Sequence, residues 1–345
     1  MTVARRQLVD LELTRYYHCI SRCVRRAYLC GAGHEHRKAW IEQRLELLAE
    51  NFAVAVCGYS VMDNHLHLLL RLDPQTAADW SDEQVVRRWL AVYPPRTLDR
   101  EDPKLLQQYV ARELQDPARV ATYRERLQDL GWFMKALKEP LARLANKEDH
   151  CTGTFWESRY KSIAILDEEA LLATCAYIDL NPVAAGMAAT PEASPHTSVR
   201  QRVCHARKQG KLSALKAAEH GSVAGSRAVG TLEADHWLCP IEDLRSKGAT
   251  REGMLAGFSL GSYLMLVDYT GRLCRQGKAR LSLQLACIFD RLGTSQELWQ
   301  RRLTKLLTKS RQFGNYFATD ATRLRHAATR RGVHHVDNAL QLAPG

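Results

Sequence analysis

The chain has 345 residues, of which 46% are hydrophobic and 25% charged, so its composition is that of an ordinary globular protein with room for two domains. Its first ten residues contain Arg5, Arg6 and Asp10, and no run of about 18 apolar residues occurs anywhere, which argues against a signal peptide and a membrane span and predicts a cytoplasmic protein. The ten cysteines form no C-x-x-C pair, which argues against a zinc ribbon and a disulfide framework.

The net charge of +11 is concentrated in the C-terminal part of the chain. Residues 201 to 345 contain 23 Lys and Arg against 11 Asp and Glu, a net charge of +12, whereas residues 1 to 200 contain 26 against 27. A basic extension on a near-neutral domain predicts a polyanion partner, with nucleic acid the favoured class. The alternative is that these side chains only keep the protein soluble.

The first 200 residues predict alternating strands and helices. An alternating aromatic and β-branched run predicts a strand over 15–21, and a helix follows over 36–51. Two paired strands come next, then an insertion of short helices broken by prolines, a helix, a strand and a last helix capped by Asp167. The order β-α-β-β-α-β-α predicts an α+β fold with a ferredoxin-like antiparallel sheet. The ranges for these later elements are 53–62 and 65–72 for the strands, about 73–130 for the insertion, 132–146 for the helix and 159–166 for the strand.

The remainder predicts a linker and a second domain. Glycines among small and basic residues indicate a linker over 201–230, and residues 231–345 are predicted to form a basic, mainly helical, DNA-binding extension. Leu281–Leu292 predicts a helix, followed by Gly293 as its cap and a capping box at 294–297 that opens a second helix. This second helix, with Arg301, Arg302 and Lys305, either enters DNA as part of a helix-turn-helix or presents a solvated basic face on a plain bundle.

The sequence His65-Leu66-His67 provides the first chemical signal. Side chains alternate along a strand, so both imidazoles leave the same side of the backbone. Two adjacent imidazoles supply half of a metal site. Taken alone, the pair is better explained as two half-buried polar residues that are hydrogen-bonded to their neighbours.

The second signal lies on the last predicted helix. Tyr177 and Asn181 are four residues apart and therefore share a face, provided that the helix persists to the residue before Pro182. If that face meets the histidine pair, the amide oxygen of Asn181 can complete a three-ligand set beside the hydroxyl of Tyr177. The alternative for Tyr177 is an amphipathic tyrosine half-buried in a helix.

Three segments together resemble the REP-associated tyrosine transposases, which are single-tyrosine members of the HUH endonuclease superfamily. The resemblance covers roughly residues 12 to 200, except much of 73 to 130. It is carried by the turn and strand Asn64-His-Leu-His67, by Gly153-Thr-Phe-Trp-Glu-Ser-Arg-Tyr-Lys-Ser162, and by Ala176-Tyr-Ile-Asp-Leu-Asn-Pro-Val-Ala-Ala-Gly186. Residues 1–200 would then form a transposase-like catalytic domain in a bacterial, nucleoid-associated protein.

The resemblance implies an activity and a set of roles. His65, His67 and Asn181 would bind Mg²⁺ or Mn²⁺, and Tyr177 would attack a phosphodiester of single-stranded DNA to form a 5′-phosphotyrosine. The substrates would be hairpins of repetitive extragenic palindromes, cut by a monomer or homodimer. The residues expected to contact DNA are Arg22, Arg25, Arg26, Arg159 and Lys161 near the site, and Arg301, Arg302 and Lys305 in the extension.

Two other functions remain open. A domesticated DNA-binding regulator would keep hairpin recognition without cutting, and a metal-dependent hydrolase would use water in place of tyrosine. The presence of both histidines, Tyr177 and Asn181 favours the nuclease, because a protein without chemistry does not need all four.

Overall fold

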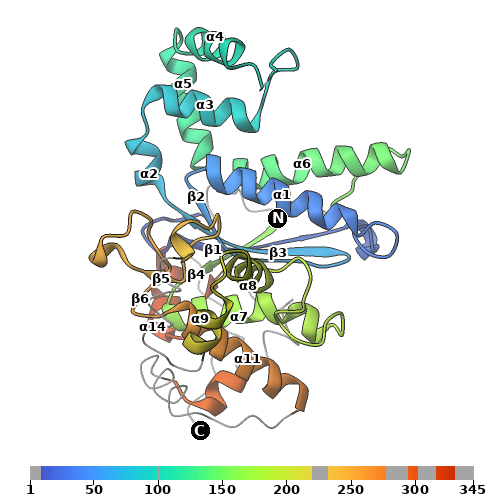
Figure 1. The fold of residues 1–345 in the computed structure, drawn as a ribbon, viewed down its shortest axis with the longest axis vertical. Coiled ribbons are helices and arrows are strands. Elements are labelled where there is room, and N and C mark those ends of the chain that lie inside the picture. Colours follow the sequence, from blue (N-terminus) through green and yellow to red (C-terminus); the bar gives the residue numbers. More distant parts are fainter. Residues whose placement is uncertain (1–8, 100, 220–231, 277–293, 302–315, 331–345) are drawn as a thin grey trace.

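The computed structural model describes residues 9–99, 101–219, 232–276, 294–301 and 316–330 (Figure 1). Its centre is a five-stranded sheet with the strand order β2-β3-β1-β4-β7. β7 runs parallel to β4, and the other neighbouring strands are antiparallel. The predicted combination of helices with a mainly antiparallel sheet is confirmed. The strands are β1 (Tyr16–Arg22), β2 (Val54–Val61), β3 (His65–Leu72), β4 (Lys161–Ile165) and β7 (Tyr316–Phe317).

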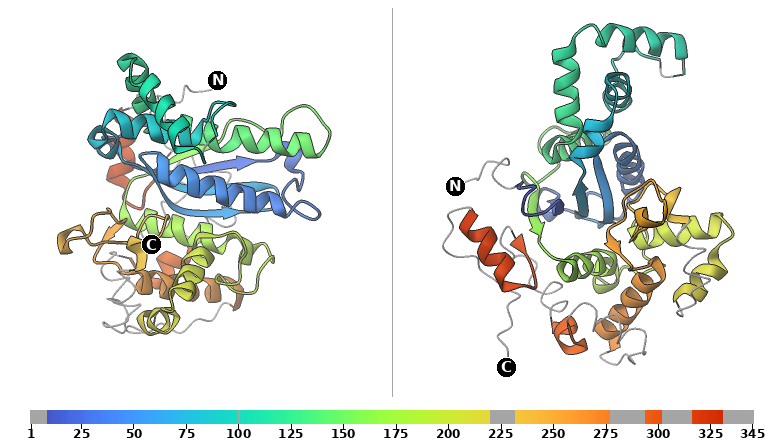
Figure 2. Two further views of the ribbon diagram at one scale, coloured as in Figure 1. Left: turned by 45° about the horizontal axis from the view of Figure 1, so that its top comes forward. Right: turned by 90° about the vertical axis from the view of Figure 1, so that its left-hand side faces the viewer.

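Helices cover both faces of this sheet. Helices α1 (His36–Asn51) and α6 (Leu130–Glu148) pack together on one face, and α7 (Glu168–Ala184) lies on the other (Figures 1 and 2). On β3, Leu66 and Leu68 belong to the core toward α1 and α6, whereas Leu69 belongs to the core around α7. Side chains therefore alternate along β3 as expected of a strand that is buried on both faces.

The helix that carries Tyr177 begins and ends where local chemistry dictates. The carboxylate of Asp167 accepts a hydrogen bond from the Ala170 backbone N–H at 2.7 Å, which confirms the predicted cap of α7. The helix continues through Pro182 to Ala184, although proline cannot donate the hydrogen bond that a helix interior needs. The last turn closes with a backbone bond from Ala185 to the Asn181 carbonyl at 2.9 Å. The predicted single face for Tyr177 and Asn181 is therefore confirmed.

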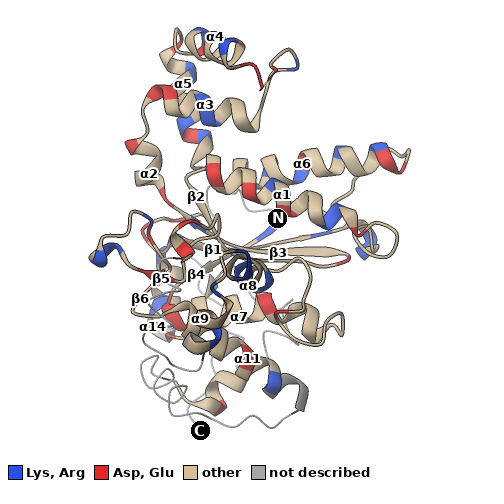
Figure 3. Cartoon of the chain, viewed as in Figure 1, with Lys and Arg blue, Asp and Glu red and all other residues tan. Residues whose placement is uncertain are grey.

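The insertion between β3 and α6 consists of short helices, as predicted. They stand together at one end of the molecule (Figure 2). Within this group Trp89 stacks on Tyr123, with ring centroids 4.4 Å apart. Both acidic and basic side chains occur along them, so this part is not a uniformly basic surface (Figure 3). The helices are α2 (Pro74–Asp79), α3 (Asp82–Val92), α4 (Pro103–Glu113) and α5 (Pro117–Leu127).

The C-terminal part packs on the same sheet. α11 contacts α7 and α9, and β7 extends the main sheet beside β4. The described part of the predicted linker 201–230 is largely helical, because α8 runs into it and α9 lies within it, while 220–231 lie outside the described residues. The elements are α8 (Ser198–Lys208), α9 (Leu212–Glu219), β5 (Glu242–Asp243), a 3-10 turn η3 (Arg245–Lys247), β6 (Leu255–Ala256), α11 (Leu260–Gln276) and α14 (Ala321–Arg330).

Only part of the predicted helix pair after residue 280 can be compared with the structure. The predicted helix Leu281–Leu292 and Gly293 lie outside the described residues, as do Arg302 and Lys305. The second helix is described from 296 to 301, and its cap is Ser295, whose hydroxyl accepts from the Leu298 N–H at 3.2 Å. The cap therefore lies one residue later than the predicted capping box, which started at Thr294.

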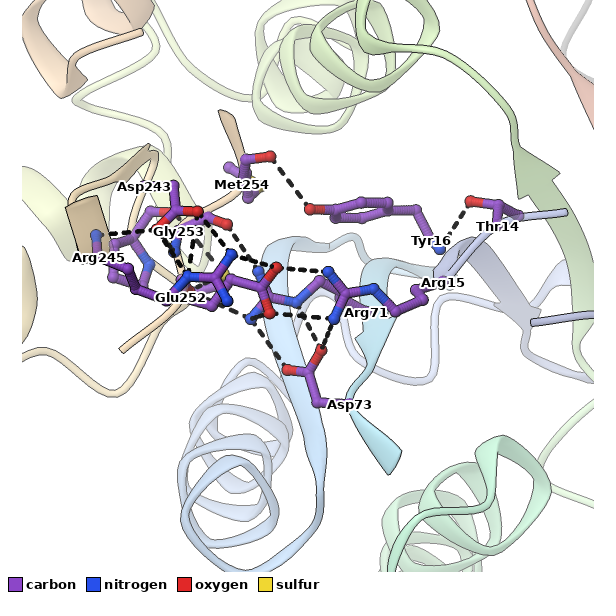
Figure 4. A network of polar contacts seen from close by, with 12 residues as sticks. Thr14, Arg15, Tyr16, Arg71, Asp73, Asp243, Arg245, Glu252, Gly253 and Met254 are labelled. Atoms are coloured by element: carbon purple, nitrogen blue, oxygen red, sulfur yellow. Dashed lines mark hydrogen bonds and ion pairs between the residues drawn. The ribbon is translucent and has the colours of Figure 1, made fainter. Parts of the chain in front are cut away.

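An ionic network ties this C-terminal part to the sheet at the end of β3 (Figure 4). Arg71 is 3% exposed, binds both carboxylate oxygens of Asp73, and donates to the Gly253 carbonyl at 2.8 Å. The Arg15 guanidinium forms ion pairs with Asp73, at 3.1 Å, and with Glu252, at 2.5 Å. The segment around Glu252 is thus packed directly on the sheet.

Among the described residues, no helix is both long enough and apolar enough to cross a membrane.

Candidate active site

Strand β3 places His65 and His67 on the face of the sheet that α7 covers. Across β1, Arg22 lies opposite His65, and Ile20 lies opposite His67. On the other side of β1, Lys161 lies opposite Ile20. Residues directly opposite one another in antiparallel strands share a face. Two basic side chains therefore accompany the two histidines.

The turn before β3 fixes the orientation of His65. The Asn64 side-chain amide donates to the Arg26 carbonyl at 3.1 Å, so its oxygen is the atom that lies 2.7 Å from Nδ1 of His65. An amide oxygen can only accept, so Nδ1 of His65 carries the proton and Nε2 carries the lone pair. His65 thus has the tautomer that a metal ligand needs.

A third histidine, which the sequence analysis missed, lies behind His67. Nε2 of His18 on β1 is 2.9 Å from Nδ1 of His67, and the two rings stack with centroids 5.2 Å apart. The ring centroids of His65 and His67 are 4.9 Å apart. Because Nδ1 is hydrogen-bonded in both His65 and His67, Nε2 of each ring is the atom left for a metal.

Burial keeps these imidazoles neutral. It lowers the pKa of His65 to about 4, with the charge of Arg22 adding to the effect. Burial likewise lowers the pKa of His67 well below its ordinary value and that of His18 to about 3, and Lys161 contributes at His18. At neutral pH each ring therefore retains a lone pair for a metal or a hydrogen bond.

Helix α7 brings Tyr177 against this cluster. The Tyr177 ring meets those of His67 and His18 edge-on, with centroids 5.3 and 5.9 Å apart. Tyr177 is 3% exposed, so the half-buried amphipathic tyrosine considered above does not describe it. The structure thus brings together the predicted nucleophile and one predicted metal ligand.

A buried carboxylate two residues further on anchors α7. Asp179 accepts hydrogen bonds from the Ser198 hydroxyl at 2.6 Å, the Val199 N–H at 3.0 Å and the Tyr263 hydroxyl at 2.5 Å. Its partners belong to α8 and α11, so three helices meet at one side chain. Burial raises the pKa of Asp179, while these donors oppose the rise.

Asn181 is half-buried one turn after Tyr177, and its amide donates to the Tyr177 carbonyl at 3.3 Å. This bond uses the amide nitrogen and leaves the role of the oxygen open. The assignment of Asn181 as the third metal ligand stays a prediction.

Basic residues lie near the histidine pair on β1, β4 and the turn after β1. Burial lowers the pKa of Lys161, and the neighbouring charge of Arg22 lowers it further. Arg25 and Arg26 are exposed in the 3-10 turn η2 (Val24–Arg26), where both have positive φ angles of 52° and 56°. Asn64 holds this strained loop beside the turn that precedes β3 through the Arg26 carbonyl.

The Phe-Trp-Glu-Ser-Arg segment supports the end of β1. Its Glu157 N–H donates to the Arg22 carbonyl at 2.8 Å, and the Trp156 indole N–H donates to the Lys138 carbonyl at 3.1 Å. The aromatic pair therefore has a structural role, while Arg159 is exposed. Arg301 is also exposed, on the short helical turn from 296 to 301.

Among the described residues, the pair His65 and His67 suits a divalent transition metal better than a second cluster of possible ligands does. Two neutral imidazole nitrogens suit a transition metal such as Mn²⁺, and the predicted Asn181 oxygen would be a third ligand of a kind that Mn²⁺ accepts. His34, Glu148 and Asp149 also place ligand atoms within 4.8 Å of one another. However, the buried Arg37 already pairs with both of these carboxylates, which places a positive charge where a cation would bind.

Comparisons with known proteins give one similar fold. Neither a protein-family model nor a curated protein sequence matches the chain. A solved structure of a REP-associated tyrosine transposase bound to a REP hairpin is similar at 12% sequence identity, with a TM-score of 0.35. The similarity covers 59% of this chain and 86% of the other. This similarity is too slight to assign a function, so a functional assignment depends on the site residues.

Proposed function

We propose that the chain is a metal-dependent endonuclease and strand transferase that cuts single-stranded DNA beside hairpins through a covalent 5′-phosphotyrosine. The observation that carries this proposal is the contact between Tyr177 and His67, beside a His65 whose tautomer is set for a metal. A tyrosine that served only as core packing would not need two oriented, neutral imidazoles next to it.

The side chains have separate tasks in this reaction. Nε2 of His65, Nε2 of His67 and the Asn181 oxygen would hold Mn²⁺ or Mg²⁺. When bound, the cation polarises a non-bridging phosphate oxygen and stabilises the leaving 3′ oxygen. The Tyr177 hydroxyl forms a bond to phosphorus and releases its proton to water, while the bond from phosphorus to the 3′ oxygen breaks. That oxygen takes up a proton. In the reverse step a 3′-hydroxyl loses its proton and attacks phosphorus, the bond to the Tyr177 oxygen breaks, and the tyrosine hydroxyl and a phosphodiester are restored.

The basic residues support a phosphate substrate. Burial and the charge of Arg22 lower the pKa of Lys161, so an anionic phosphate between these two side chains and the histidines would relieve their repulsion. Arg25, Arg26 and Arg159 are exposed at the same end of β1 and would contact the backbone of flanking nucleotides. Tyr28 is 68% exposed just after the η2 turn, where its ring is available to stack on a base.

The strand order of the sheet supports this assignment. The order β2-β3-β1-β4 with antiparallel neighbours supports a ferredoxin-like arrangement of the first 200 residues. The division at 201–230 and the DNA-binding role of residues 231–345, including Arg301, remain proposals. So do the hairpin sequence, transposition as the biological outcome, and a monomer or homodimer as the active form.

The test is adduct formation. Protein and labelled single-stranded hairpin DNA are incubated with Mn²⁺ or Mg²⁺ and resolved on a denaturing gel. The unmodified protein should give a metal-dependent covalent band, and Tyr177→Phe should give none. Tyr93→Phe is the matched control, because among the described residues the Tyr93 hydroxyl is buried without a hydrogen-bond partner, so its loss should leave the band unchanged.

Two other results would replace the proposal. Tight hairpin binding without product, for several hairpins and both metals, would identify a non-cleaving regulator. Cleavage without an adduct, unchanged in Tyr177→Phe, would identify a hydrolase that uses water.

A further inference from the structure

A third histidine is built into the core of the proposed site. His18 lies on β1, between the strands that carry His67 and Lys161, and it is 4% exposed. Its Nε2 is 2.9 Å from Nδ1 of His67, and its ring meets the Tyr177 ring edge-on at 5.9 Å. It therefore contacts both a metal ligand and the nucleophile while lying behind them.

The hydrogen bond between the two rings constrains both tautomers. If His67 coordinates through Nε2, its proton must be on Nδ1, so Nδ1 donates and Nε2 of His18 accepts. His18 then carries its own proton on Nδ1. The neighbouring His65 is oriented in the same way, because the Asn64 amide oxygen accepts from its Nδ1 at 2.7 Å.

The surroundings explain why a neutral acceptor occupies this position. A carboxylate is the common partner of a metal-bound histidine, but burying its charge beside the aliphatic core of β1 and β4 would be costly. An imidazole accepts the same hydrogen bond without a charge, and its flat ring stacks on His67 at an interplanar angle of 25°. The ring thus supplies both an acceptor and a packing surface.

We propose that His18 is a positioning residue that holds His67 in its metal-binding tautomer and sets Tyr177 against it. The inference depends on the proposed function for the existence of the metal site. It requires no contact between His18 and the metal or DNA.

Metal binding without DNA tests this role. Mn²⁺ binding is measured by calorimetry and by the paramagnetic resonance signal of free Mn²⁺, with the full chain and two variants. His18→Phe keeps a flat ring but removes the acceptor, and it should weaken Mn²⁺ binding about 10–100-fold. His18→Gln offers an amide oxygen near the former Nε2, and it should restore binding to within about threefold of the unmodified protein, by the same acceptor argument.

Controls separate positioning from folding. His236→Phe replaces another buried histidine, 5% exposed and outside the site, and should leave Mn²⁺ affinity unchanged. Thermal unfolding is followed for every variant, and hairpin binding in EDTA should be equal for all. The rate of adduct formation at saturating DNA should fall in His18→Phe, while the hairpin dissociation constant stays the same.

Each result decides the inference. Equal Mn²⁺ affinity in His18→Phe and the unmodified protein would overturn it, as would a loss in His18→Gln as large as in His18→Phe, including a loss through misfolding of both. An unmodified protein that binds no Mn²⁺ would overturn the inference together with the proposed metal site. A protein that binds Mn²⁺ in the predicted order of variants but forms no adduct would support the role of His18 and refute the nuclease.

Discussion

Asp179 gives the sharpest prediction about how the site is held in place. Its carboxylate is 1% exposed and accepts from two hydroxyls and one backbone N–H, on Ser198, Tyr263 and Val199. Replacement by alanine would leave the Tyr263 hydroxyl and the Val199 N–H in the core without their hydrogen-bond acceptor. Ser198 would lose less, because its hydroxyl can donate to the Tyr59 carbonyl at 3.3 Å.

The expected loss of stability follows from these two unpaired donors. Each buried, unpaired donor costs about 1–3 kcal/mol, so Asp179→Ala should lower the free energy of unfolding by about 3–5 kcal/mol once a small cavity is included. Asp179→Asn keeps the shape and one acceptor oxygen, and it should cost only about 1–2 kcal/mol. Urea denaturation at pH 7 measures both, and Asp235→Ala, on an exposed carboxylate, should change stability by less than about 0.5 kcal/mol.

The pKa of Asp179 adds a pH dependence with a definite sign. Because burial raises this pKa above its ordinary value of 3.8, the folded state holds the proton more tightly than the unfolded state does. The contribution of the protonated Asp179 to the free energy of unfolding is therefore fully present below pH 3.8. It is lost as the pH rises through the folded-state pKa of Asp179. The advantage of the unmodified protein over Asp179→Asn should therefore be larger at pH 4 than at pH 8. A loss below about 1 kcal/mol in Asp179→Ala, or an advantage that grows with pH, would refute the reasoning.

The other predictions concern metal and DNA. Asn64→Ala removes the acceptor for His65 and should weaken Mn²⁺ binding about 10–100-fold in calorimetry, so an unchanged affinity would contradict the tautomer argument. Arg22→Gln and Lys161→Gln should each reduce the slope of log affinity against log salt for single-stranded DNA by about 0.7 in fluorescence anisotropy, and an unaltered slope would exclude phosphate contact. Tyr28→Ala should weaken single-stranded DNA binding by about 1–3 kcal/mol while Tyr28→Phe binds normally, and equal affinity in the alanine variant would exclude stacking.

Local patterns predicted much of the catalytic half. The helix over 36–51 and the strand over 65–72 have their predicted bounds, because apolar residues at helical spacing predict a helix and a short apolar run after a turn predicts a buried strand. The co-facing histidines follow from strand periodicity alone. The face shared by Tyr177 and Asn181 depended on α7 reaching Asn181, and it does so despite Pro182.

Long-range pairing was not predictable in the same way. His18 sits in a predicted strand, but its contact with His67 depends on which strands are neighbours and on their register. Asn64 was identified as a turn residue, and only its bond to the Arg26 carbonyl shows that its oxygen faces His65. Likewise, the two-residue strand β7 joins the main sheet from about 150 residues away along the chain, which no local pattern encodes.

The central claim is that Tyr177 becomes covalently linked to DNA. The most direct measurement is mass spectrometry of the trapped adduct after digestion with trypsin and nuclease. Trypsin should release residues 162–200, in which Tyr177 is the only tyrosine. The account predicts that this peptide, and no other, carries a nucleotide phosphate in the presence of Mn²⁺. A nucleotide on a different peptide, or an unmodified 162–200 peptide from DNA that has been cut, would contradict it.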